Sequence, residues 1–115
     1  MDYVEEFIRV ADDGRRKLDP ESAVNIVSHL GDGNVHYTML PTSADKILHE
    51  KLREMVEDAA LSCRGSFSAE HGIGLAKRGG MARRKDPVAL ETMRKIKRAL
   101  DPNNLMNPGK VLPDD

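Results

Sequence analysis

Two histidines, His29 and His36, flank a Gly-Asp-Gly-Asn segment at residues 31–34. That composition is typical of a tight turn between two antiparallel strands. With a four-residue loop at 31–34, Leu30 lies opposite Val35 and His29 lies opposite His36. Directly opposed residues have Cβ atoms about 4.5–5.5 Å apart, so the two imidazoles could bind one metal ion.

Glu70 and His71 form a second group of side chains that could take part in chemistry. Two imidazoles and one carboxylate are a ligand set of catalytic zinc sites that leave a position open for substrate. An extended strand would direct Glu70 and His71 to opposite sides, so both serve one site only if the chain bends at His71, which Gly72 permits. The alternative is that these histidines have only structural roles, and spacing alone leaves both interpretations open.

Three helices and three strands are expected to position these side chains. Helical spacing of apolar residues begins at Val4, and Gly14 with the Asp19-Pro20 pair should break that helix. Alternation over 23–40 predicts two strands, and Ser43 is expected to cap a helix that ends near Gly65. The apolar positions of that helix are Leu48, Leu52, Met55, Val56, Ala59 and Cys63.

The second half of the sequence should contain one strand, one long loop and one helix. Residues 66–70 are expected to form the strand, followed by a basic loop. Asp86 and Pro87 start a helix that the Asp101-Pro102 pair ends, and the proline-containing tail after it should be extended. The basic residues of the loop are Lys77, Arg78, Arg83, Arg84 and Lys85.

This order of elements predicts an α+β fold with a ferredoxin-like antiparallel sheet and helices on one face. One more strand before the first helix would complete the β-α-β-β-α-β pattern, so we expect a fragment that lacks its first strand. A three-stranded sheet that is complete as it stands is the alternative. The hairpin face opposite the histidines has a core pattern, namely Ile26, Leu30, Val35 and Met39, whereas Val27 and Leu40 on the histidine side should be covered by something else.

Composition excludes several classes of protein. The chain has 115 residues and a formal net charge of -1, which fits one domain and disfavours nucleic-acid binding. No apolar run reaches the length of a membrane span, and the first residues are acidic, so we expect a cytoplasmic protein. Cys63 is the only cysteine, so any metal would be bound by His, Asp or Glu.

Four segments of the sequence, in the same order, resemble the C-terminal domain of the FAD-linked oxidases. The segments are 28–36 (SHLGDGNVH), 68–74 (SAEHGIG), 96–102 (IKRALDP) and 107–111 (NPGKV). This family includes D-lactate dehydrogenase, D-2-hydroxyglutarate dehydrogenase and the flavin subunit of glycolate oxidase. The resemblance implies that residues 1–115 are a cap over an FAD-binding domain that this chain lacks and that belongs to the same protein or to a partner chain.

The resemblance also implies a site. His29, His36 and Glu70 would bind a divalent metal, zinc or manganese; His71 would be the general base; and Asn107 would approach the flavin. The implied reaction oxidises a small 2-hydroxy acid to the 2-oxo acid, and the isolated chain should be inactive because it has no flavin. Family members often have asparagine two residues after the second metal-binding histidine, whereas this chain has Thr38, which bears on substrate choice.

A different class of function remains an alternative, namely a stand-alone metal-binding or protein-interaction module without catalytic activity. Apolar residues left exposed where a flavin domain should sit also predict self-association into a homo-oligomer.

Overall fold

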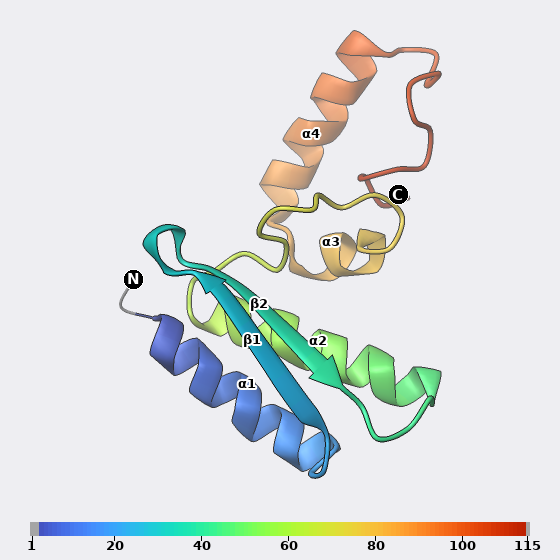
Figure 1. Ribbon diagram of the computed structural model, residues 1–115. Helices are drawn as coiled ribbons and strands as arrows, with labels where there is room; N and C mark the ends of the chain where they lie inside the picture. The colour runs from blue at the N-terminus through green and yellow to red at the C-terminus, as the bar shows by residue number, and fades with distance from the viewer. Residues whose placement is uncertain (1–2, 115) are drawn as a thin grey trace. The chain divides into compact units, whose positions relative to one another are not determined.

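The computed structural model describes residues 3–114 and divides the chain into unit 1, Met1–Ala69, and unit 2, Glu70–Asp115. The helices and strands confirm the predicted α+β class (Figure 1). Unit 1 contains α1 (Val4–Leu18), β1 (Ala23–His29), the 3-10 turn η1 (Leu30–Asp32), β2 (Asn34–Leu40) and α2 (Lys46–Ser62), and unit 2 contains α3 (Arg78–Arg84) and α4 (Pro87–Leu100).

Helix α1 runs past Gly14, which was expected to help break it, and ends at Leu18, just before the Asp19-Pro20 pair as predicted. A Cβ atom at Gly14 would lie 2.6 Å from both Cγ and Sδ of Met55, which belongs to α2. Glycine is therefore present because α1 and α2 approach closely here, and the packing gain outweighs its poor helix propensity. Ala11, one turn earlier, is completely buried.

Helix α2 is capped by Asp45 rather than by Ser43. An Asp45 carboxylate oxygen accepts a hydrogen bond from the Ile47 N–H at 3.0 Å, which satisfies a backbone donor of the first turn. The Ser43 hydroxyl instead accepts from the Asp45 N–H at 3.1 Å. The helix ends near Gly65 as predicted, because the Gly65 N–H donates to the Ala60 carbonyl at 2.8 Å.

The β1–β2 hairpin has a different register from the predicted one. His29 pairs with Asn34 and Val27 pairs with His36, so the predicted His29–His36 pairing is wrong. The connection is one 3-10 turn closed by Gly33, which adopts φ +68° and donates its N–H to the Leu30 carbonyl at 3.2 Å. The loop therefore occupies 30–33 instead of 31–34, which shifts the pairing by two residues and keeps the side chains that remain in the strands on their predicted faces.

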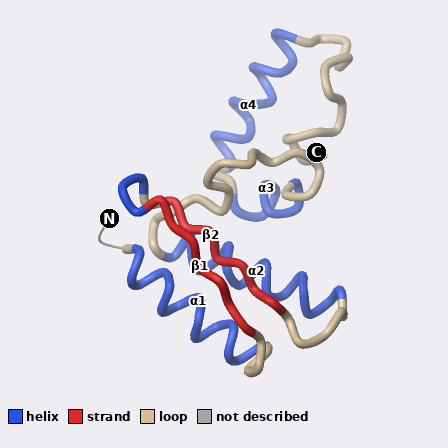
Figure 2. Tube along the Cα trace, viewed as in Figure 1, coloured by secondary structure: helices blue, strands red, loops and turns tan. Residues whose placement is uncertain are grey.

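Both helices of unit 1 lie on one face of the hairpin, as predicted (Figure 2). Tyr37 of β2 packs edge-on against Phe7 of α1, with ring centroids 6.0 Å apart and planes at 76°. Because successive side chains of a strand alternate, His36 and Thr38 point to the opposite face. Leu30, predicted on the core face, lies in η1 and is 59% exposed because the turn takes it out of the strand.

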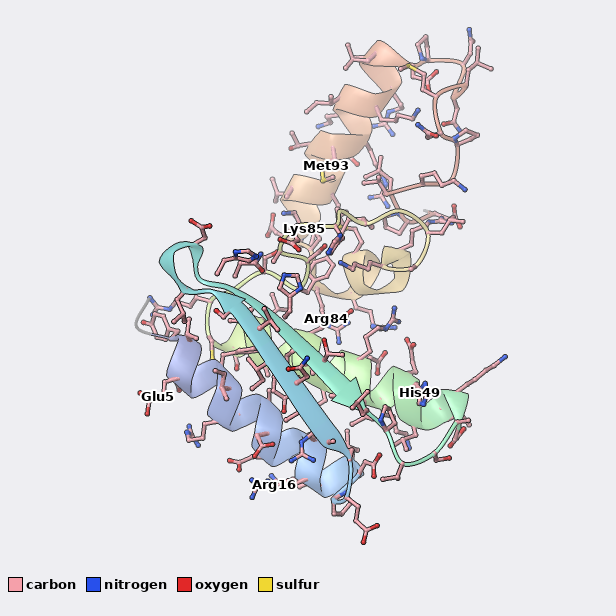
Figure 3. The ribbon with its side chains drawn as sticks, viewed as in Figure 1. Glu5, Arg16, His49, Arg84, Lys85 and Met93 are labelled. Carbon is pink, nitrogen blue, oxygen red and sulfur yellow. The ribbon has the colours of Figure 1, made fainter. Side chains whose placement is uncertain are left out.

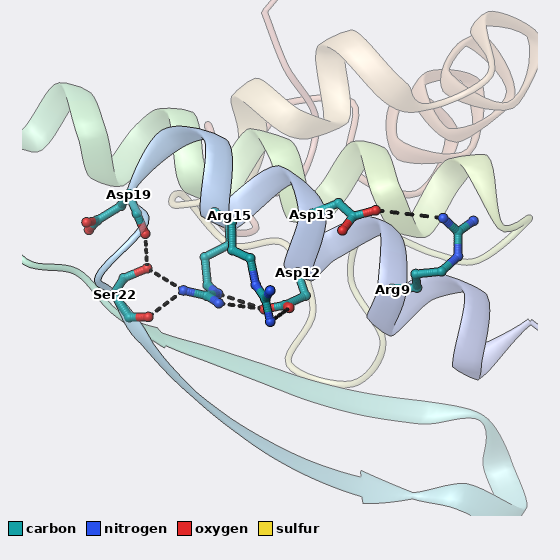
Figure 4. Close-up of polar contacts among 7 residues, drawn as sticks. Arg9, Asp12, Asp13, Arg15, Asp19 and Ser22 are labelled. Carbon is teal, nitrogen blue, oxygen red and sulfur yellow. Dashed lines mark hydrogen bonds and ion pairs between the residues drawn. The ribbon is translucent and has the colours of Figure 1, made fainter.

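A polar network around Arg15 fixes the ends of the hairpin relative to α1 (Figure 4). The buried Arg15 guanidinium pairs with an Asp12 carboxylate oxygen at 2.6 Å and donates to the Ser22 hydroxyl at 3.1 Å. Asp19 accepts from the Thr42 N–H at 2.8 Å and from the Thr42 hydroxyl at 2.7 Å. These two bonds, the backbone one first, lower the pKa of the Asp19 carboxyl below its ordinary value.

The segment predicted as a third strand is irregular, and over residues 3–114 the sheet has two strands. The Ser66 hydroxyl accepts from the Ser68 N–H at 3.3 Å and donates to the Ser68 carbonyl at 3.1 Å. These local bonds give the backbone an alternative to a strand ladder.

Unit 2 contains one unpredicted helix and one predicted helix. Residues expected to form a basic loop include α3, where Gly80 and Met81 are buried. Helix α4 begins and ends as predicted, since an Asp86 carboxylate oxygen caps it by accepting from the Ala89 N–H at 2.9 Å.

The tail after α4 is non-helical, as predicted, but it is not extended: it forms turns and bends and folds back within unit 2. The Asp101 carboxylate accepts from the Leu105 and Met106 N–H groups, both at 2.8 Å, and from the Lys97 ammonium. The Lys97 bond is the largest cause of the lowered pKa of the Asp101 carboxyl. Farther along, the Val111 N–H donates to the Gly74 carbonyl at 3.0 Å, which joins the two ends of the unit.

Candidate functional site

The structure brings His29 and His36 together despite the changed register. His29 ends β1 and is exposed, whereas His36 lies in β2 and is half-buried. Their ring centroids are 6.0 Å apart with planes at 66°, and they offer ring nitrogens within 4.8 Å of each other. They are diagonal neighbours rather than direct partners, a spacing that long side chains still bridge.

The histidines share one surface, which we call the histidine face: Asn25, Val27, His29, Asn34, His36 and Thr38. Val27, directly opposite His36, is the one apolar member of this face and is 55% exposed, so the face is largely polar and open to solvent. Leu40, farther along β2 on the same side, is 59% exposed. The face can therefore accept a ligand directly over the two rings.

Glu70 and His71 are the first two residues of unit 2, and their side chains touch. A Glu70 carboxylate oxygen lies 3.0 Å from His71 Nε2. Their side chains are 40% and 78% exposed, respectively. The backbone bends through Glu70 and His71, and Gly72 adopts φ +67°. The backbone therefore has the bend at His71 that would let the Glu70 and His71 side chains take part in one site.

A cavity of about 530 Å³ opens at the turn end of unit 1. Its lining includes Phe7, Asn34, Cys63 and Ala69. Asn34 is the cross-strand partner of His29, and Ala69 is bonded directly to Glu70. The segment that leads into Glu70 and the residues that follow His29 thus line the same cavity.

Asn107 lies in the tail of unit 2 with φ +48°, a conformation that asparagine tolerates better than most residues. It lines a cavity of about 770 Å³ between α4 and the tail, together with Lys97, Leu100, Met106 and Lys110. The Asn107 carbonyl accepts from the Lys110 N–H at 3.2 Å. This turn leaves the Asn107 side chain exposed.

Two other polar features have structural partners. His49 is exposed on α2 (Figure 3), and its Nε2 lies 2.7 Å from the Ser43 carbonyl oxygen. From the predicted basic loop, Arg78 donates to the Leu112 carbonyl at 3.1 Å and pairs with Asp114 at 2.6 Å. Arg78 therefore holds the tail.

Comparison with known proteins decides the family. Residues 1–111 match the model of the family described as FAD linked oxidases, C-terminal domain. The chain belongs to this family. Its family is thus the one predicted by the resemblance, and FAD and an FAD-binding domain are implied in the full protein.

Three relatives illustrate the match. The chain is 37% identical over 86% of its length to D-lactate dehydrogenase [cytochrome] of Arabidopsis thaliana. It is 39% identical over 96% to a probable D-2-hydroxyglutarate dehydrogenase of Oryza sativa subsp. indica and 41% identical over 88% to D-2-hydroxyglutarate dehydrogenase of Bos taurus. It spans 18%, 20% and 19% of these proteins, respectively, or about a fifth of each.

These three relatives are named as mitochondrial proteins, which overturns the cytoplasmic setting expected from the sequence. The expectation relied in part on the acidic first residues of this chain. Because the chain covers about a fifth of each relative, its first residues do not indicate where a longer protein is located in the cell. Over residues 3–114, no helix is both long and apolar enough to cross a bilayer.

Proposed function

We propose that this chain is the metal- and substrate-binding part of an FAD-linked D-2-hydroxy acid dehydrogenase. His29, His36 and Glu70 hold a divalent metal, zinc or manganese, and His71 is the general base. The observation that carries the proposal is the convergence of two imidazoles on one exposed hairpin face, with ring nitrogens within 4.8 Å.

The donor set fits such a metal. Imidazole nitrogen and carboxylate oxygen suit zinc and manganese, and three protein ligands leave a position for substrate. Two nitrogens bound to one tetrahedral zinc ion lie about 3.4 Å apart, so ring rotations of His29 and His36 would bring their nitrogens, which are within 4.8 Å, closer together. Glu70 directly follows Ala69, which lines the same cavity as Asn34, and consecutive Cα atoms are about 3.8 Å apart.

His71 is proposed to take the substrate's hydroxyl proton. Glu70 lies against His71 Nε2, so the Nε2–H can donate to the carboxylate, which orients the ring and assigns Nδ1 as the atom that accepts the proton. The substrate loses that proton from oxygen and a hydride from C2 as the carbonyl double bond forms. His71 is 78% exposed, so it is open to an incoming acid.

The two bound groups would supply the remaining chemistry. The metal would polarise the substrate's hydroxyl and make it more acidic. The flavin would accept the two electrons removed from C2. Asn107 is proposed to approach the flavin from the tail of unit 2, whereas the FAD-binding domain would lie in the rest of the protein or in a partner chain.

Zinc titration of the metal-stripped chain by calorimetry tests the metal site. We expect saturable one-site binding that is lost in His29→Ala and kept in His49→Ala, which removes an exposed histidine of α2. Equal binding by both variants would contradict the site. Metal binding without any turnover in the FAD-loaded protein would instead favour a stand-alone metal-binding module.

A further inference from the structure

The two-stranded sheet of unit 1 has unprotected edges. Across residues 3–114, β1 and β2 have only each other as strand neighbours, so each presents one row of backbone N–H and C=O groups that no strand pairs. Natural proteins protect such edges with charged side chains, proline or a bulge. Neither strand contains Lys, Arg, Asp, Glu or Pro, and their one-to-one register has no bulge. Each edge is therefore open to another strand.

A cavity distinguishes the β2 edge from the β1 edge. The cavity of about 530 Å³ at the turn end of unit 1 is lined by Asn34 and Val35 of β2, whereas none of its described lining residues belongs to β1. Other walls come from Phe7 of α1 and Cys63 of α2, so the cavity lies on the helix side of β2. A residue placed opposite Val35 on an added strand would have its Cβ about 4.5–5.5 Å away, within reach of this space.

The β2 strand can pair with β2 of a second copy of the chain. A two-fold axis between identical antiparallel strands gives an isologous contact, in which both subunits use the same surface. With the two strands fully overlapped, the axis passes beside Tyr37, and Val35 lies opposite Met39 of the second copy. Opposed residues share one face of a sheet, so residues that face the helices meet residues that face the helices. Methionine fills irregular gaps well, so Met39 of the second copy suits the cavity beside Val35.

We propose that the chain forms a homodimer by antiparallel pairing of the β2 edges of two copies, which extends the sheet from two strands to four. The second copy supplies an uncharged strand of matching length and pattern. Main-chain hydrogen bonds hold such a dimer, whereas the self-association expected from the sequence relied on exposed apolar side chains. Strand addition occurs at the edge of the sheet, so the histidine face of each copy stays open and the proposal does not depend on the metal site.

A charge placed on β2 tests the pairing. Thr38 and Asn25 are both exposed and lie opposite each other across the hairpin, so lysine at either position adds the same charge to the same face. In the dimer the two Thr38 positions are diagonal neighbours about 7–8 Å apart, whereas the two Asn25 positions are separated by three strand spacings, about 14 Å. Screening at physiological salt acts over about 8 Å, so only Thr38→Lys should cause strong repulsion between the copies.

Analytical ultracentrifugation of the 115-residue chain, with a chelator present to prevent metal bridges between histidines, measures the Kd of the dimer. We expect a concentration-dependent dimer, a Kd about tenfold higher in Thr38→Lys and an unchanged Kd in Asn25→Lys. Thr38→Glu alone should weaken the dimer to a similar extent. An equimolar mixture of Thr38→Lys and Thr38→Glu should restore dimers, because the two charges then attract each other across the interface.

Three results would overturn the proposal. The first is a parent chain that stays monomeric at every concentration. The second is a dimer that Asn25→Lys weakens as much as Thr38→Lys does, because the contact would then lie elsewhere. The third is a mixture of the two Thr38 variants that dimerises no better than either variant alone, since a substitution that only disturbed the fold would not be rescued by mixing.

Discussion

Replacing Gly14 with alanine tests how closely α1 and α2 pack. The new Cβ would lie 2.6 Å from Cγ and Sδ of Met55, whereas ordinary contacts of a Cβ atom begin at 3.4 Å. The Met55 side chain would have to move by about 1 Å in a packed interface, at a cost of about 1–3 kcal/mol. Alanine in a helix interior gains about 0.5–1 kcal/mol over glycine. The steric cost should exceed this gain, so Gly14→Ala should lose about 1 kcal/mol of unfolding free energy.

A double-mutant cycle isolates the steric cost. In a Met55→Ala background the obstructing atoms are gone, so Gly14→Ala should stabilise the chain by about 0.5–1 kcal/mol. The two substitutions should therefore couple by about 2 kcal/mol, which is typical of residues in contact. Urea unfolding followed by far-UV circular dichroism gives all four free energies.

Gly31→Ala is the matched control, because a Cβ there meets nothing within 4 Å. It should stabilise unit 1 slightly, by about 0.4–1 kcal/mol, through the unfolded chain. The reasoning is refuted if Gly14→Ala raises the stability of the parent chain, or if the sign of its effect is the same with and without Met55.

Three other outcomes are expected. The pKa of the Asp19 carboxyl is lowered from its ordinary value of 3.8, so the stabilising contribution of the Asp19 carboxylate is complete above pH 3.8 and is lost as pH falls towards the lower pKa of the folded state. The difference in urea midpoint between the parent and Asp19→Asn should therefore become smaller as pH is lowered from about 6 to about 3. Asp86→Ala should cost about 1 kcal/mol of α4 stability in urea unfolding, whereas Asp86→Asn keeps a capping oxygen and should cost little. In the FAD-loaded protein, His71→Gln should lower turnover by about 10²–10⁴ without changing the metal Kd, and a His49→Gln variant should match the parent; unchanged turnover in His71→Gln would remove the general-base role.

Local signals in the sequence predict most of the helices, and tertiary packing explains the errors. Asp86 with Pro87 marks the start of α4 because capping depends on neighbouring residues alone. The sequence predicts a break at Gly14 together with Asp19-Pro20, because the packing of Gly14 against Met55 cannot be recognised without α2. Helix α3 was missed because Gly79 and Gly80 lower its helix propensity, and burial of Met81 compensates.

The sequence predicts which side of the hairpin the candidate site residues occupy, but not which residues pair across the two strands. Alternation alone places His29 and His36 on one side of the hairpin, and a shift of two residues leaves that side unchanged. Which residues are opposite each other depends on whether the turn closes at Gly33 or at Asn34, and the sequence Gly-Asp-Gly-Asn permits both. The Val27–His36 pairing could be found only after that register was known, because no local spacing links residues nine positions apart.

The alternation of β2 has a consequence for how this strand tolerates mutation. His36 and Thr38 face the side of the proposed metal site, while Val35 and Tyr37 between and beside them face the helices. Substitutions at successive positions should therefore alternate between variants that are well folded but poor at binding and variants that bind only as far as they remain folded. If His36 is a metal ligand as proposed, selection for folding would act on Val35 and Tyr37 and selection for binding would act on His36, at alternate positions of one strand.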